Sequence, residues 1–403
     1  MRVLILTTQY PYPVRSGNAL RTLALLERLA PRHEITIMAF AQRDDPAVQA
    51  LRDRGMQCIS VRPPAWTPLR NARIAAWSLA GRLPYIMATH CTPAMRQALS
   101  RALNSGKYDL LHCDSISLAP LAAECGFRPA VLVEHNVESL IWQRVAKHER
   151  RPLHKAFVML QSRKLERAEG KVCRAFDACV AVSQPDAELL REWYGVQNVR
   201  IVPNGVELCD DSADDAPQDG ALAFVGSMDW MPNQDAVRWM TSEVMPLIRR
   251  RHPQVTLTIV GRNPPAWMRK MSGNGIRVTG TVEDVRPYIK RSAVCIVPLR
   301  IGGGTRLKIL EAMAAGRPVV STSVGAEGLD LRPGREIVIA DSPREFADQV
   351  VGLLAHEERR RQLAQAGKEA AKRHSWDIIA PELERVWLSL LAPAYKTAAN
   401  CGK

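Results

Sequence analysis

The chain has 403 residues, of which 46% are hydrophobic and 24% are charged, a globular composition long enough for two cores. No apolar run approaches the roughly 20 residues of a membrane-spanning helix, and the N-terminal run lacks a signal-peptide cleavage site. The nine cysteines are scattered and never take the spacing of a paired metal knuckle. This composition argues against a membrane-spanning protein and a disulfide scaffold, and we expect a cytoplasmic protein with free thiols.

The net charge of +14 is concentrated in the first half of the chain. Residues 1–200 hold 28 Lys+Arg against 17 Asp+Glu, whereas residues 201–403 hold 27 against 24. Between Asp53 and Asp109 there are eight basic residues and no acidic one, interspersed with Trp66, Trp77 and Tyr85. Such a surface favours an anionic partner, which could be acidic lipid headgroups, a lipid-phosphate acceptor or nucleic acid. The alternative is a solvated basic face that aids solubility.

Short apolar runs alternate with segments of helical periodicity along the whole chain. Strands are expected in the first half at residues 3–8, 35–40, 109–113, 130–134, 178–183 and 199–202. In the second half they are expected at residues 221–226, 255–261, 276–279, 293–298, 318–322 and 336–340. Helices between near-continuous apolar strands indicate parallel sheets covered on both faces, so the predicted fold class is α/β.

A segment rich in Asp, Gly and Pro divides the chain at residues 204–220. We therefore expect two doubly wound, Rossmann-like domains, at residues 1–203 and 221–375, joined by this linker. Strand ends of the two domains would face each other across a cleft, where open α/β sheets bind ligands. The last segment, 376–403, is expected to contain a helix that packs back on the first domain.

The segment 298–328 carries the strongest chemical signal. Three glycines, Gly302, Gly303 and Gly304, and then Thr305 lead into an expected helix. Its first turn would carry Arg306 and Lys308, with Glu311 about one turn further on. Glycine amides, two cations and a helix N-terminus suit a diphosphate, and a nearby carboxylate suits sugar hydroxyls. The plain alternative is a strand-to-helix turn with a surface ion pair. The sequence of this segment matches neither a Walker loop nor a dinucleotide-binding fingerprint.

The same segment resembles a known family. EAMAAGRPVVST, followed by Gly325 and Glu327, is similar to the retaining glycosyltransferases of family 4, which have the two-domain GT-B fold. Further motifs occur in the family's order: Pro11, Pro13 and Gly17; 109–112; 134–136; 176–177 with 182–183; 203–206; and 375–377. Within the family, GSMDWMPNQDAV and GGGTRLKILEAMAAG look most like sugar transferases encoded with exosortase-linked (PEP-CTERM) exopolysaccharide systems.

The resemblance implies roles for particular residues. Gly17 would lie in the glycine loop beside the donor phosphates. His135 would contact the transferred sugar or position an acceptor hydroxyl, and Arg262 would line the base or phosphate side. A structural histidine and an ordinary loop cation are the alternatives. His112 and Asp114 are weaker candidates for the wall of the cleft.

Two departures from the family pattern bear on the donor. Gly303 stands where the family usually has a Glu that approaches the hydroxyls of the donor sugar. Ser227 and Pro232-Asn233 stand where it usually has an Arg and a Lys-Gly pair. We therefore assign the diphosphate charges to Arg306 and Lys308, and the ribose hydroxyls to Glu311. No Asp-x-Asp pair occurs, so we expect no metal.

The sequence thus predicts a metal-independent, retaining hexosyltransferase that uses a nucleotide-diphosphate sugar and no further cofactor. The acceptor would be a glycan or a lipid-linked molecule of exopolysaccharide biosynthesis, met at the inner face of the cytoplasmic membrane. Retention would follow a same-face displacement, as in the family. Two alternatives stay open: a nucleotide-sugar 2-epimerase of the same fold, and a non-enzymatic protein that binds anions or nucleic acid. For the transferase, no nucleic-acid partner is expected.

Overall fold

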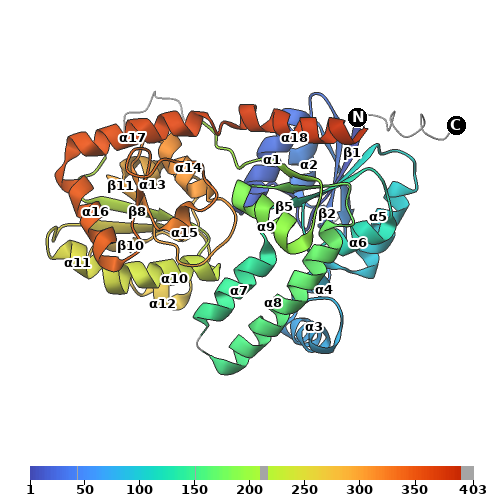
Figure 1. Cartoon of the computed structure of the whole chain (residues 1–403), viewed down its shortest axis with the longest axis horizontal. Helices are drawn as coiled ribbons and strands as arrows, with labels where there is room; N and C mark the ends of the chain where they lie inside the picture. The colour runs from blue at the N-terminus through green and yellow to red at the C-terminus, as the bar shows by residue number, and fades with distance from the viewer. Residues whose placement is uncertain (43, 150, 209–216, 392–403) are drawn as a thin grey trace. The chain divides into compact units, whose positions relative to one another are not determined.

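The computed structural model describes residues 1–42, 44–149, 151–208 and 217–391. It divides into two compact units (Figure 1). Unit 1 comprises Met1–Pro203 together with the segment that starts at Ile379, and unit 2 is Asn204–Ile378. The segment expected to be a linker therefore starts inside unit 2, and residues 209–216 of it lie outside the described residues.

Unit 1 is built on a seven-stranded sheet in which every pair of neighbours is parallel, in the order β3-β2-β1-β4-β5-β6-β7. Its strands are β1 (Arg2–Leu6), β2 (Glu34–Phe40), β3 (Met56–Val61), β4 (Leu110–Cys113), β5 (Ala130–Glu134), β6 (Ala178–Ala181) and β7 (Val199–Ile201). Six of them confirm expected strands. The edge strand β3 was not predicted, because its sequence, MQCISV, mixes polar and apolar residues and only its two ends are buried.

Among the described residues, ten helices belong wholly or partly to unit 1. They are α1 (Gly17–Leu29), α2 (Pro46–Arg52), α3 (Pro68–Ala80), α4 (Tyr85–His90), α5 (Pro93–Leu103), α6 (Ala119–Cys125), α7 (Glu138–His148), α8 (Pro152–Cys173), α9 (Gln184–Tyr194) and α18 (Trp376–Leu391). Helix α18 begins in unit 2 and belongs to unit 1 from Ile379 onward. None of the helices in the described ranges is both long and apolar enough to cross a membrane.

Unit 2 contains a six-stranded sheet whose neighbours are all parallel, in the order β10-β9-β8-β11-β12-β13. Its strands are β8 (Ala221–Val225), β9 (Thr256–Val260), β10 (Ile276–Val278), β11 (Val294–Val297), β12 (Val319–Ser321) and β13 (Val338–Ile339), each at an expected position. Its helices are α10 (Met231–Trp239), α11 (Met245–Arg249), α12 (Ala266–Arg269), α13 (Arg286–Arg291), α14 (Leu307–Ala314), α15 (Ser323–Ala326), α16 (Pro343–Ala355) and α17 (Glu357–Lys372). A π-helical turn, η1 (Met240–Val244), joins α10 to α11.

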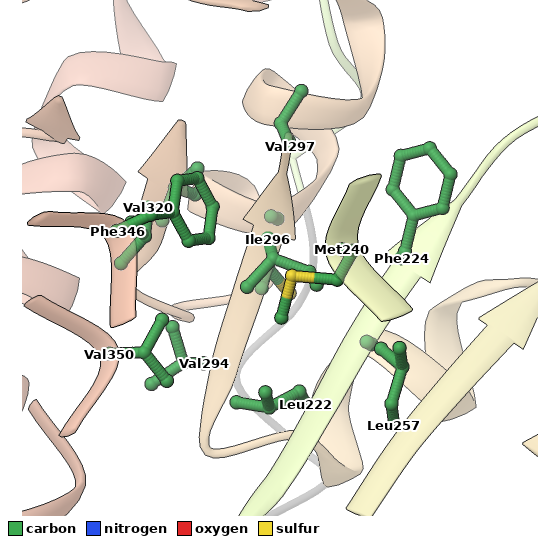
Figure 2. Close-up of a cluster of buried hydrophobic side chains, with 14 of the residues drawn as sticks. Leu222, Phe224, Met240, Leu257, Val294, Ile296, Val297, Val320, Phe346 and Val350 are labelled. Carbon is green, nitrogen blue, oxygen red and sulfur yellow. The ribbon is translucent and has the colours of Figure 1, made fainter. Parts of the chain in front are cut away.

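The core of unit 2 explains why its central strands read as unbroken apolar runs. Consecutive residues are buried in both central strands, 222–224 in β8 and 294–297 in β11, so both faces of these strands are covered; Leu222, Phe224, Val294 and Ile296 are among the core residues in Figure 2. Met240 comes from the turn η1. Burial at about 25 cal/mol per Å² of apolar surface makes this cluster the main stabilising contribution of the unit. A rigid sheet then holds the loops at the strand ends.

The start and end of unit 2 are joined by the motif Pro203-Asn204-Gly205-Val206. Val206 accepts a backbone hydrogen bond from Trp376 and donates one to His374 at 2.7 Å. Gly205 is pressed against the indole of Trp376, where a Cβ would come within 2.4 Å of the ring. A glycine is therefore required for close approach, and this segment is held within unit 2 rather than extending freely as a linker.

Candidate active site

In unit 1 a pocket opens at the carboxyl ends of β1, β4 and β5. The strand order reverses between β1 and β4, the switch point at which open α/β sheets bind ligands. The walls of the pocket include Ser16, Asn18 and Thr22 at the start of α1, and Asp114 and His135 after β4 and β5. Gly17 is the first residue of α1, exposed between two wall residues, and the Ser16 hydroxyl caps the helix by accepting from Ala19 N at 3.2 Å. Gly17, predicted to lie in a glycine loop beside the donor phosphates, thus lies at a helix N-terminus.

Asp114 is the centre of a buried polar network in this pocket. Its Oδ1 lies 3.1 Å from His135 Nε2 and 3.5 Å from His112 Nε2, while its Oδ2 accepts from the Thr22 hydroxyl at 2.5 Å. Burial alone would raise the pKa of the Asp114 carboxyl, but His135 and His112 outweigh burial and hold it well below its usual range. Asp114 is therefore a carboxylate that orients two imidazoles.

A residue from the far end of the chain completes the network. Trp387, on α18, donates its indole N–H to His112 Nδ1 at 3.0 Å. Because the indole can only donate, His112 Nδ1 must accept, and its proton lies on Nε2, facing Asp114. His135 Nε2 also lies 3.2 Å from the Asp114 backbone carbonyl, a second acceptor, so this nitrogen carries a proton. The chain of contacts Trp387–His112–Asp114–His135, the histidine relay, is buried in unit 1 up to Asp114, and His135 borders the pocket.

The turn that carries His135 is fixed from behind by α8. Glu169 of α8 accepts from the backbone N–H groups of Glu138 at 2.7 Å and Ser139 at 3.1 Å, and from the hydroxyl of Tyr194 at 2.5 Å. It therefore caps the N-terminus of α7, whose own N-cap residue supplies no side-chain bond. Burial raises the pKa of Glu169, and burial together with Glu169 raises that of Glu134.

In unit 2 two glycine-containing loops, after β8 and β9, meet beside the switch point between β8 and β11. A Cβ on Gly261 would come within 1.7 Å of the Gly226 carbonyl, and one on Gly226 would lie 2.8 Å from Lys308 Nζ. The loops after β8 and β9 therefore touch, and Lys308 reaches the first of them from α14. Arg262, half-exposed, donates to the Ser227 hydroxyl at 2.9 Å across the same loops.

Lys308 is held by the residues that replace the family's usual basic pair. Its ammonium donates to Asn233 Oδ1 at 3.0 Å and lies 4.4 Å from the centroid of the Phe224 ring. Burial, and next the charge of Arg306, lower the pKa of Lys308 to about 7. Asn233 in turn donates to the Ser227 carbonyl at 2.8 Å. In the sequence, Asn233 was noted only as a position where the family usually has a basic pair. In the structure its side chain orients the ammonium of Lys308.

Arg306 lies differently from the sequence prediction. Helix α14 starts at Leu307, and Arg306 is its N-cap residue with extended backbone, so it is not in the first turn. Its buried guanidinium turns back onto the glycine loop, where it donates to the Gly303 carbonyl and packs against Gly302. Gly304 has a φ of 65°, in the left-handed region that favours glycine. The loop and the arginine thus form one packed unit.

Thr305 and Glu311 complete the site in unit 2. The side-chain amide of Asn204 donates to the Thr305 hydroxyl at 2.5 Å, so the Pro-Asn-Gly motif braces the loop that enters α14. Glu311 is half-buried one turn beyond Lys308, and its carboxylate accepts no hydrogen bond from any residue that the structure describes. Burial raises the pKa of this carboxyl. No cluster of three or more His, Cys, Asp or Glu suited to a metal occurs within the described ranges.

Two protein-family models match the chain, one in each half. The model described as Glycosyltransferase Family 4 matches residues 16–209, and the model described as Glycosyl transferases group 1 matches residues 219–356. With two parallel-sheet Rossmann-like domains, the fold is GT-B, and these matches support a glycosyltransferase of the family 4 type.

Relatives and solved structures agree with this class. The chain is 27% identical over 376 residues to a phosphatidyl-myo-inositol mannosyltransferase of Mycobacterium leprae, covering 88% of this chain and 91% of the relative. Sucrose-phosphate synthase of Thermosynechococcus elongatus aligns with a TM-score of 0.75 at 18% identity, covering 97% and 99% of the two chains. HepE of Anabaena, in complex with UDP-glucose, aligns at 0.70 and 14%, covering 97% and 100%.

Proposed function

We propose that this protein is a retaining, metal-independent glycosyltransferase that moves a sugar from a nucleotide-diphosphate sugar to a glycan or lipid-linked acceptor. The observation that carries the proposal is the arrangement around Lys308 in unit 2. A half-buried ammonium stands at the entrance of α14 beside a glycine loop. One turn further along is the half-buried Glu311 carboxylate, which accepts no side-chain hydrogen bond from the described residues. This order suits a diphosphate followed by a ribose.

Each predicted residue receives a role in this proposal. Lys308, with the amides of 302–305, binds the diphosphate and stabilises its charge as it leaves. Arg306, packed on the glycine loop, contributes positive charge behind these amides. Glu311 accepts from the ribose hydroxyls, and Arg262 lines the nucleotide side. Gly17 offers a helix-terminal amide to the donor. His135, aligned by Asp114, orients the transferred sugar or the acceptor hydroxyl.

The substrates are proposed by class. HepE was crystallised with UDP-glucose, and the mycobacterial relatives are named for mannosyl transfer to phosphatidyl-myo-inositol. Both support a nucleotide-sugar donor, and the second supports a lipid-linked acceptor. The sequence resemblance supports a place in exopolysaccharide biosynthesis, on the cytoplasmic face of the membrane. Retention by same-face displacement comes from the family resemblance.

The test starts with donor binding by the purified protein. A thermal-shift screen with UDP-, GDP- and ADP-sugars should raise the melting temperature for one nucleotide, because a ligand that binds only the folded state stabilises it. The preferred donor, incubated with membrane-lipid extract and EDTA, should then yield a glycosylated lipid or glycan with the donor's anomeric configuration. An epimerised sugar nucleotide without acceptor modification would assign the epimerase alternative instead. Absence of any nucleotide-sugar binding would refute the proposal.

A further inference from the structure

Helix α3 carries its apolar stripe on the outside of the protein. Leu69 is 72% exposed and Trp77 is 56% exposed. Most exposed positions of α3 recur at helical spacing; these are Leu69, Ala72, Arg73, Ala76, Trp77 and Ala80. Pro68 and Leu79 are exposed as well. Surface helices normally bury such a stripe and expose the polar one. In α3 the one fully buried residue is Ser78.

Polar contacts from α8 hold α3 in this orientation. Gln161 donates to the Ser78 hydroxyl at 3.0 Å. Lys164 donates to three carbonyl oxygens at the end of α3, those of Ser78, Leu79 and Gly81, at 2.6–2.8 Å. Because the last carbonyls of a helix lack partners within it, this ammonium caps α3 and complements its dipole. The inner face is thus fixed by polar side chains, and the apolar stripe stays outward.

Exposed apolar and basic side chains flank the stripe. Trp66, just before α3, is 49% exposed, and the Arg70 guanidinium lies 4.8 Å from the centroid of its ring. Arg73 lies within the stripe, and Arg82 is exposed just beyond the helix. Helix α8, which packs against α3 (Figure 1), exposes Met159 and Leu160. No carboxylate side chain occurs between Asp53 and Asp109.

We propose that α3 and Trp66, the interfacial helix region, dock on an anionic lipid bilayer. An apolar stripe with tryptophans enters the headgroup boundary, and the arginines bind anionic headgroups. A second copy of this chain fits less well, because a symmetric contact would bring Arg73 and its basic neighbours against themselves. The docking proposal rests on the proposed function in one respect: the membrane would be the place where the enzyme meets a lipid-linked acceptor.

Vesicle binding by the full chain tests this. Wild-type protein should co-sediment with vesicles of 70% phosphatidylcholine and 30% phosphatidylglycerol, and at least tenfold less with phosphatidylcholine alone. The double variant Leu69→Glu/Trp77→Glu should lose at least tenfold in affinity for the anionic vesicles. Trp193→Glu is the matched control, because Trp193 is 42% exposed on α9 and should bind like wild type. Arg73→Glu should weaken binding with the apolar stripe intact.

Other outcomes overturn the proposal. Equal vesicle binding by wild type and the double variant would exclude α3 as the docking surface, and indifference to phosphatidylglycerol would exclude the anionic bilayer. A wild-type dimer in light scattering that the double variant abolishes would assign the stripe to self-association. Nucleotide-sugar binding, measured by thermal shift on the same samples, should be unchanged in every variant. Its absence from all of them, with vesicle binding intact, would refute the proposed function but not the docking.

Discussion

Trp387 holds His112 in one tautomer, the neutral imidazole protonated on Nε2. The 3.0 Å bond from the indole N–H to Nδ1 leaves no other arrangement, because an indole cannot accept. His112 Nε2 therefore faces Asp114, whose Oδ1 also meets His135. The tautomer of His112, the charge of Asp114 and the position of His135 are consequently linked.

Replacing Trp387 with Phe should loosen this link while keeping an aromatic ring. His112 Nδ1 would lose its donor, and the ring could exchange tautomers. We expect about tenfold slower sugar transfer, a change of about 1.4 kcal/mol in the barrier, with donor affinity unchanged. In nitrogen NMR spectra of the histidine rings, the chemical shift of His112 Nδ1 should move from that of an unprotonated nitrogen toward the average of the two tautomers. Arg385→Gln, at an exposed position on the same helix, is the control and should alter neither readout.

Asp114→Asn should destabilise unit 1, because two imidazoles would lose the carboxylate they share. We expect a loss of about 2 kcal/mol in the free energy of unfolding at pH 7, measured in urea. The pKa of Asp114 is lower in the folded protein than in the unfolded chain, so the folded state binds fewer protons. The carboxylate's contribution is therefore present above about pH 4 and lost as the pH falls below it. Wild type and variant should converge in stability at low pH; a constant difference would contradict this.

Donor binding should weaken as the pH rises, through Lys308. With a pKa of about 7, this ammonium is mostly neutral at pH 8, and binding a diphosphate must then take up a proton. The dissociation constant for the preferred nucleoside diphosphate should rise by up to about tenfold per pH unit above pH 7. Titration calorimetry in buffers of different ionisation enthalpy measures the proton uptake directly. Lys308→Arg, which stays charged, should flatten the profile; an unchanged slope would show that another group titrates.

Glu311→Ala should weaken binding of a nucleoside diphosphate at least tenfold, about 1.4 kcal/mol, because the ribose hydroxyls lose their acceptor. Binding of inorganic pyrophosphate should change little, since the diphosphate contacts are retained. Glu358→Ala, an exposed carboxylate on α17, is the matched control. Near wild-type affinity in Glu311→Ala would show that this carboxylate serves the helix rather than the ligand.

The sequence predicted the fold more completely than the site. Apolar runs located every strand except β3, because strands buried on both faces leave a strong signal that an edge strand does not. Lys308 and Glu311 were recognised as candidates because they lie close together on one helix. Asn233, 75 positions before Lys308, and Trp387, 275 positions after His112, were not, because only folding brings such partners together. Arg306 was misplaced because the sequence does not reveal that the helix begins one residue later.

The division of the chain also bears on how the protein is made. Unit 1 is discontinuous: the ring of Trp387 is buried in it, although that residue is synthesised after the whole of unit 2. A ribosome that has released Met1–Pro203 has therefore exposed a seven-stranded sheet whose His112 still lacks its indole partner. Unit 2, apart from the first residues of α18, is complete earlier. Unit 1 is thus the first unit to begin synthesis and the last to be completed. Loss of helix α18 would therefore remove part of the core of unit 1.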